Sequence, residues 1–260
     1  MKTRIILSFI AALFMQFTTV SADNYTDGLM KLMNNEVLAI VNAKMLEQAP
    51  KSPNVNADYI QNQFKTDAVE WLAGHYRKNM SEKDFNDMIS FFMQPEVMNV
   101  QKKVVTAASS SQGQELMQSL TPQVQALMMG GTPENLKEPD CDPQLKKELL
   151  RWMEINGTTE GLKASMNAVK SLIPDMAGNM PEEQKAMMTK MMDGMFTFME
   201  NNLSTIVLTA MVGKVDLKDM QVLNAVENKP FFESYKKANL SVAGDISTFM
   251  KKVMAGMKKN

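Results

Sequence analysis

Hydrophobic residues recur every three or four positions along most of this chain, the spacing that places them on one side of an α-helix. Residues 80–92 show this pattern clearly. Ser81 stands just before the stripe, where its hydroxyl can cap a helix, and Asp84 lies where its carboxylate can bond back to the cap. Pro95 then interrupts the helix, and a second helix starts there. The stripe itself consists of Phe85, Met88, Ile89 and Phe92.

The same order of cap, stripe and proline recurs in residues 215–237. Asp216 takes the place of Ser81 and Pro230 that of Pro95, each at an offset of 135 residues. Repetition of a whole pattern at a fixed offset indicates one structural unit that is built twice. At this offset the further matches are Asp219 with Asp84, Met220 with Phe85 and Leu223 with Met88.

Segments ahead of these two units also match. Residues 149–153 echo 29–33 at an offset of 120, and residues 162–168 echo 37–43 at an offset of 125. The rising offset places small insertions in the early loops of the second copy. Because apolar and polar residues do not alternate in runs, we expect no strands. The sequence therefore predicts an all-α protein of two tandem helical repeats packed together as a pseudo-twofold pair, without a sheet.

Residues 130–143 form the best internal boundary, because they hold three prolines and two glycines and lack an apolar stripe. Asp142 and Pro143 then cap the next helix. After Lys237 we expect a terminal helix without a clear counterpart in the first half. The predicted parts are a signal peptide (1–22), a helical repeat (23–129), a linker (130–143) and a second repeat with an extra C-terminal helix (144–260).

The first residues have the features of a Sec-type secretory signal. Lys2 and Arg4 provide a basic start, residues 5–17 are apolar, and small residues precede the bond between Ala22 and Asp23. We expect cleavage after Ala22 and a periplasmic or secreted mature protein; the alternative is a buried N-terminal helix. No later apolar stretch is long enough to span a bilayer, so we do not expect a transmembrane protein.

Composition narrows the function further. The chain has 260 residues, 45% of them apolar and 22% charged, with a formal net charge of −1. A protein without excess basic charge is not expected to bind nucleic acid.

Cys141 is the single cysteine, so it cannot form an internal disulfide. Its acidic neighbours Asp140 and Asp142 make it a poor nucleophile. It is either an incidental thiol or the link of a disulfide-bonded dimer.

His75 is the single histidine. It continues a stripe with Phe64, Ala68 and Trp71, and that stripe offers no carboxylate or nucleophile as a catalytic partner. We therefore interpret His75 as a structural residue at the edge of the core. The chain also lacks the Gly-x-Ser-x-Gly, His-Glu-x-x-His and Cys-x-x-Cys motifs. We expect no cofactor and favour a protein that is not an enzyme, with a hydrolase of unfamiliar site as the third hypothesis.

Methionine is the unusual residue, with 27 in the chain. Thioether sulfur is a soft ligand that suits Cu(I), so a helix rich in methionine could bind this ion. Methionine also fills helical cores in place of leucine, and we favour this interpretation. A third possibility is a methionine-lined groove for an apolar peptide or a lipid. The five residues that could serve as metal ligands are Met188, Met191, Met192, Met195 and Met199.

Residues 67–76 (DAVEWLAGHY), 80–85 (MSEKDF) and 89–97 (ISFFMQPEV) carry a resemblance to a known family. They resemble the bacterial family called domain of unknown function twenty-fifty-nine, whose members are small, secreted and helical. The match covers residues 60–105, and a weaker second match covers 203–237. In this second copy Glu227 stands where Phe92 is. The resemblance implies architecture and compartment but no activity.

These observations lead to one leading hypothesis and two alternatives. The protein is expected to be a non-enzymatic binding or structural module of the cell envelope. The first alternative is a methionine-rich Cu(I)-binding protein. The second is a binder of apolar peptide or lipid, and an envelope protein is a further possible partner.

Overall fold

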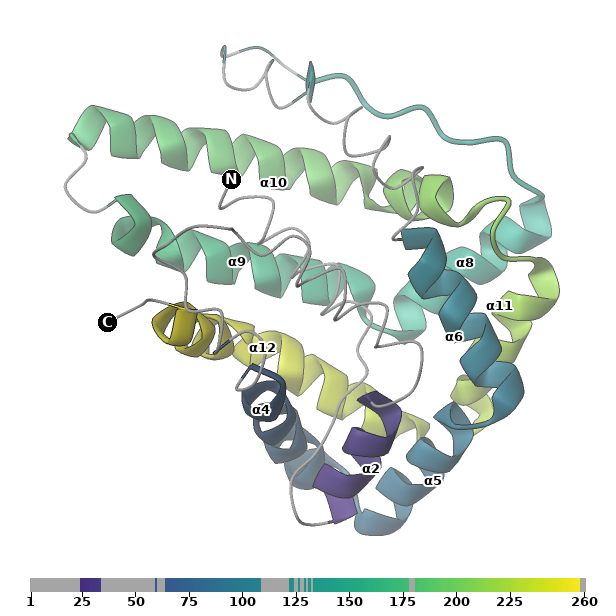
Figure 1. Cartoon of the computed structure of the whole chain (residues 1–260). Coiled ribbons are helices and arrows are strands. Elements are labelled where there is room, and N and C mark those ends of the chain that lie inside the picture. The colour runs from purple at the N-terminus through teal and green to yellow at the C-terminus, as the bar shows by residue number, and fades with distance from the viewer. Residues whose placement is uncertain are drawn as a thin grey trace.

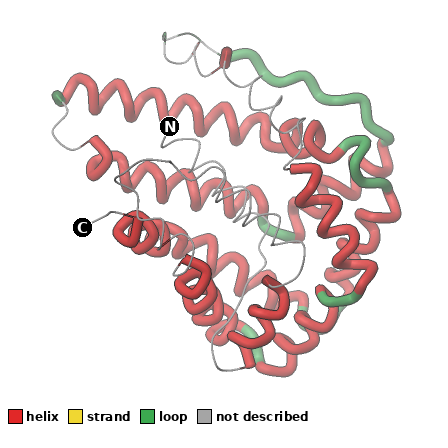
Figure 2. The backbone as a smooth tube through the Cα atoms, viewed as in Figure 1, coloured by secondary structure: helices red, strands yellow, loops and turns green. Residues whose placement is uncertain are grey.

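The structure, a computed structural model, describes residues 24–33, 59, 64–108, 122, 123, 126, 129, 131, 133–177 and 181–257. Within them the all-α prediction is confirmed, because every regular element is a helix (Figure 2). The predicted signal peptide lies outside the described residues. The helices are α2 (Asn24–Met33), α4 (Phe64–Asn79), α5 (Glu82–Phe92), α6 (Pro95–Ala108), α8 (Pro143–Ile155), α9 (Thr158–Ala177), α10 (Glu182–Met211), α11 (Leu217–Asn224), the 3-10 helix η2 (Ala225–Asn228) and α12 (Phe232–Met257).

Local capping explains where these helices begin. The Ser81 side chain accepts a hydrogen bond from the Asp84 amide at 3.1 Å, as predicted. In the second unit the Asp216 and Asp219 side chains each accept from the other's amide, at 2.8 and 3.0 Å, which completes a capping box. The Asp219 carboxylate also binds Lys103 Nζ at 2.6 Å, so it joins α11 to α6. These caps satisfy amide groups that a helix start leaves without partners.

Helix α8 is delimited by residues that the sequence identified. Asp142 Oδ1 accepts hydrogen bonds from the amides of Gln144 and Leu145, both at 2.9 Å, and Pro143 occupies the first turn. At the other end Gly157 has φ +61°, a left-handed conformation that glycine adopts easily. The helix therefore ends here, and the chain turns directly into α9.

Four helices lie side by side in a row, in the order α10, α9, α12 and α4 (Figure 1). Helix α12 contacts α9 on one side and α4 on the other. Helix α2 packs on α4 and α5, and α6 packs on α10 and α11. The main hydrophobic core therefore contains side chains from both ends of the chain, among them the fully buried Tyr76, Phe85, Leu149, Leu208 and Tyr235.

Helix α12 differs from the prediction in its start. The sequence predicted a separate terminal helix after Lys237, whereas one continuous helix runs from Phe232 to Met257. No residue between Phe232 and Lys237 interrupts a helix, so the chain continues without a break after Pro230. Val242, Ile246, Phe249 and Val253 recur at helical spacing along α12, and all four are buried.

The contacts between helices have a regularity that bears on the predicted repeat. If α2, α4, α5 and α6 correspond to α8, α10, α11 and α12, then several contacts between these helices occur in matching pairs. Thus α4 packs on α12 and α10 on α6, α5 packs on α12 and α11 on α6, and α2 packs on α5 as α8 does on α11. Helices α5 and α11 also begin 135 residues apart, at Glu82 and Leu217. Duplication stays a prediction, and this exchange of contacts supports it.

Candidate functional site

A cleft of about 590 Å³ opens between α8, η2 and the first turns of α12. One face of α8 forms its longest wall, because the lining residues recur at the helical spacing of three or four positions. Ile155 and Phe232, which are 4% and 8% exposed, contribute apolar surface at its base. The residues that α8 contributes are Lys146, Lys147, Leu150, Arg151, Glu154 and Ile155.

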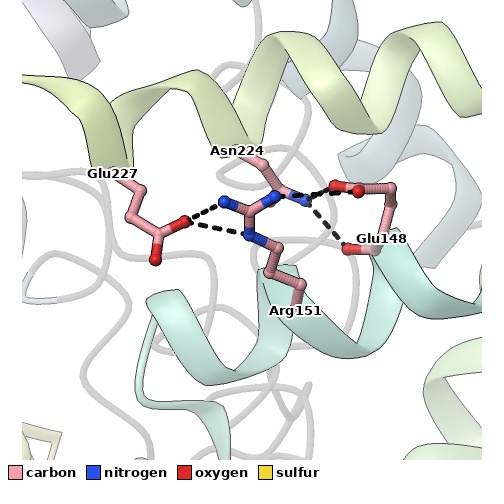
Figure 3. A network of polar contacts seen from close by, with 4 residues as sticks. All are labelled: Glu148, Arg151, Asn224 and Glu227. Atoms are coloured by element: carbon pink, nitrogen blue, oxygen red, sulfur yellow. Dashed lines mark hydrogen bonds and ion pairs between the residues drawn. The ribbon is translucent and has the colours of Figure 1, made fainter.

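Arg151 is fixed in this cleft by a network of polar contacts (Figure 3). Its Nε donates to Glu227 Oε2 at 2.9 Å, and its Nη2 binds the same oxygen. On the other side its Nη1 lies 3.7 Å from Glu148 Oε1. Asn224 Nδ2 then donates to the backbone oxygen of Glu148 at 3.0 Å and to its Oε2 at 2.7 Å. The network ties α8 to α11 and η2, so it sets the width of the cleft.

Positive charge dominates the lining. Lys236 of α12 adds to Lys146, Lys147 and Arg151, and the carboxylates are those of Glu154 and Glu227, so cations outnumber carboxylates four to two. Such a cleft attracts anions, since the low-dielectric walls concentrate the field of the charges. An anion with an apolar part would find donors and an apolar base in the same hollow.

His75 has partners that the sequence did not predict. Its Nδ1 lies 2.8 Å from Ser241 Oγ and its Nε2 lies 3.2 Å from Asp245 Oδ2. The expectation that His75 has no hydroxyl or carboxylate partner was therefore wrong. The residues of its own stripe could not reveal these two, because they belong to α12 and meet α4 only in the folded protein.

Asp245 also accepts a hydrogen bond from Trp71 Nε1 at 2.8 Å, and the Trp71 ring stacks on Phe249. Burial alone would raise the pKa of Asp245, but hydrogen bonds from Thr248, Trp71 and His75 outweigh it and hold this pKa below its ordinary value. The ionised Asp245 favours a His75 tautomer with its proton on Nε2, so Ser241 donates to Nδ1. Trp71 and His75 of α4 thus bond to Ser241 and Asp245 of α12, and these contacts join the two helices.

Serine, histidine and aspartate are also the residues of a nucleophilic triad. Ser241, however, lies inside α12, where backbone amides bond to carbonyls four residues earlier and cannot serve as an oxyanion hole. Trp71 and His75 further share one oxygen of Asp245. We interpret the cluster as a polar contact that aligns two helices, with His75 at the edge of the core as predicted.

The predicted methionine ligands lie along the first half of α10. Met195 is 7% exposed and belongs to a small apolar cluster with Leu162, Met166 and Phe196. Met192 and Met199 are partly buried and pack against this cluster. Met188 and Met191 are half-buried closer to the start of the helix. Three of the five sulfurs therefore contribute to packing between α9 and α10, and Cu(I) binding stays a prediction.

Cys141 is half-buried in the extended connection before α8. Burial raises the pKa of its thiol, and the nearby carboxylates, Asp142 foremost, raise it further. The thiol is therefore a poor nucleophile, as its neighbours indicated.

Among the described residues no group of three or more His, Cys, Asp or Glu is placed to hold a metal ion. None of the helices in the described ranges combines the length and the apolar character that crossing a membrane requires.

Two features of the sequence bear on the cleft. Lys146, Lys147 and Arg151 occupy one face of the helix that Asp142 caps. Glu227 stands where the first copy has the apolar Phe92. Either feature alone is ordinary, since charged residues commonly cover the solvent side of a helix.

Compared with known proteins, the chain matches no family model, and no similar curated protein or solved structure was found.

Proposed function

We propose that this protein is a non-enzymatic binding module of the cell envelope, and that the cleft between α8, η2 and α12 holds its ligand. The observation that carries this proposal is the cleft itself. Its volume of about 590 Å³ falls within the range of small-ligand pockets. Its charged side chains stand beside the apolar surface of Leu150, Ile155 and Phe232, so a ligand can gain contacts of both kinds. The fixed position of Arg151 supplies a preorganised donor.

Export with cleavage after Ala22 is part of the same proposal. Helix α2 begins at Asn24, and its residues Thr26, Leu29 and Leu32 are buried. Cleavage before Asp23 therefore leaves every described contact in place. Cell fractionation and N-terminal sequencing test this step: the mature chain is expected outside the cytoplasm with Asp23 as its first residue. A chain that keeps residues 1–22 in the cytoplasm would contradict it.

Filling the cleft tests the binding function. The variant Leu150→Trp places an indole against the apolar base, and Leu240→Trp, at an exposed site on α12, is its matched control. Small molecules that raise the melting temperature of the native protein are expected to raise that of Leu240→Trp equally and to have little effect on Leu150→Trp. The proposal fails if no compound stabilises the native protein, or if Leu150→Trp responds as strongly as its control.

A further inference from the structure

We infer that the cleft takes an anionic small molecule, one that joins a carboxylate or phosphate group to an apolar body. This inference rests on the proposed function, because it names the class of ligand for the same cleft. Four features of the lining support it: its charge, the availability of that charge, the direction of the charge along α8, and the apolar surface beside it.

Positive side chains outnumber negative ones in the lining, although the whole chain carries a formal net charge of −1. Glu138 and Glu148, which lie outside the lining, pair with Lys146 and Arg151. The positive charge that a ligand can use is therefore that of Lys147 and Lys236. These two lysines steer anions toward the cleft and disfavour cations.

In the part of the chain that the structure describes, two of the cations in the lining have no carboxylate partner. Lys146 forms an ion pair with Glu138, and Arg151 is held by Glu227. Among the described residues Lys147 and Lys236 form no ion pair, and they project from two different helices, α8 and α12, that border the same hollow. A ligand anion between them would gain charge-assisted hydrogen bonds from both walls.

The charge along α8 also has a direction. Lys146 and Lys147 lie in its first turns, Arg151 follows, and Glu154 comes last. Helix geometry separates Lys147 from Glu154 by about 10 Å along the axis. The positive end of the helix dipole is at the same end as the two lysines. An acidic head group is therefore favoured near Lys147 and disfavoured near Glu154.

The apolar base makes a free inorganic anion a poor match. Leu150, Ile155 and Phe232 line the hollow, and its 590 Å³ equals the volume of roughly twenty water molecules at ~30 Å³ each. A lone phosphate would leave most of that space and all of that surface to water. An alkyl or aryl body covers the apolar surface and adds affinity in proportion to the area it buries.

A series of matched octyl compounds tests the inference by calorimetry on the full mature chain. Octanoate and octyl phosphate carry the two anionic heads, octyl glucoside is neutral, octyltrimethylammonium is cationic, and inorganic phosphate lacks the chain. At least one anionic octyl compound is expected to bind tenfold or more tightly than the neutral and cationic ones. Whichever anion binds more tightly identifies the head group.

Two double variants then locate the binding. Lys147→Gln with Lys236→Gln is expected to weaken the anionic compound at least tenfold. Lys214→Gln with Lys237→Gln removes the same charge from two exposed lysines outside the lining, and is expected to bind as the native protein does. Circular dichroism spectra of both double variants show whether the fold is intact.

The outcomes separate the two proposals. Equal binding of octyl glucoside and the anions, or equal effects of the two double variants, would overturn the anionic class while leaving the cleft as a binding site. Binding of inorganic phosphate as tight as that of octyl phosphate would overturn the apolar body. If no octyl compound binds, but Leu150→Trp abolishes the effect of another compound, the inference fails and the proposed function stands.

Discussion

At the scale of single residues, Gly256 shows how closely α12 approaches the N-terminal half. A Cβ atom at this position would lie 2.3 Å from the ring of Tyr59, far inside any normal contact. The Tyr59 hydroxyl donates to Asp67 Oδ2 at 2.9 Å, and Lys252 pairs with Asp67 Oδ1 at 3.0 Å. Burial raises the pKa of Tyr59, and the Asp67 carboxylate raises it further, so its hydroxyl stays protonated. The glycine thus leaves room for a buried polar link.

The substitution Gly256→Ala is therefore expected to destabilise the protein by about 1–3 kcal/mol, because the Tyr59 ring must move and its bond to Asp67 is disturbed. Gly244→Ala on the same helix is the control, since nothing lies within 4 Å of a Cβ there. That variant is expected to be neutral or to gain up to about 1 kcal/mol from helix propensity. Urea unfolding of both variants measures the difference. Equal stability of the two would contradict the close contact.

Asp245 gives a prediction about pH. A carboxyl whose pKa is lower in the folded than in the unfolded protein stabilises the fold above its ordinary pKa. This contribution begins to be lost as pH falls below about 4, the usual pKa of an aspartate in an unfolded chain. The loss continues as pH falls through the lower pKa that Asp245 has in the folded protein. The Asp245→Asn variant is expected to lose less stability than the native protein between pH 5 and pH 2.5.

The effect of Asp245 should be small, about 0.5 kcal/mol, because its side chain is 39% exposed and solvent screens its contacts. Urea midpoints measured across this pH range provide the test. Asp87→Asn is a suitable control, as this exposed carboxylate pairs within the described ranges only with Lys83, four residues earlier. A native protein that shows the same pH profile as Asp245→Asn would contradict a lowered pKa.

At the scale of helices, the sequence predicted what short-range signals determine. Ser81, Asp142 and Asp216 cap helices through bonds to amides two or three residues away, so their roles were visible in the sequence. The partners of His75 are 166 and 170 residues distant, and no local pattern specifies them. The cleft likewise needs α8 and α12 to be neighbours, which only packing determines. The fold class was predictable for this reason, and the candidate site was not.

The methionine-rich part of α10 offers a test at the same scale. Leucine can replace methionine in a packed cluster at a cost of less than about 1.5 kcal/mol per site, because the volumes are similar. Met192→Leu, Met195→Leu and Met199→Leu combined are therefore expected to cost less than about 4.5 kcal/mol in total and to leave the protein folded. They should also leave Cu(I) affinity, measured by competition with a chelator, unchanged. Loss of Cu(I) affinity with intact folding would favour a metal site instead.

At the scale of the whole molecule, the two halves share one core. Helix α12 lies between α9 and α4, and α6 lies against α10 and α11, so each half supplies a helix that the other needs (Figure 1). Leu136 in the connection between them donates its amide to Asn202 Oδ1 at 2.8 Å. Among the described residues, each half therefore covers part of the apolar surface of the other. We expect one cooperative unfolding transition for the chain, since a shared core couples the halves.

Cutting the connection tests this coupling. A specific protease site inserted between the exposed Lys137 and Glu138 would divide the chain without removing a buried side chain. After cleavage the two fragments are expected to elute together in gel filtration and to separate only in denaturant that unfolds them. Uncut protein carrying the same insertion is the control. Fragments that elute apart under native conditions would show that the halves are independent domains.

The pairing of α4 with α12 also affects how the protein is made. Helix α12 is the last described helix to leave the ribosome, so the face of α4 that it covers stays open until synthesis is nearly complete. A chain with an independent N-terminal domain can complete the core of that domain early in synthesis. This chain cannot, because its core needs α12. Under the export that we propose, a chain that completes its core late stays extended for longer, and extended chain is the form that an export channel accepts.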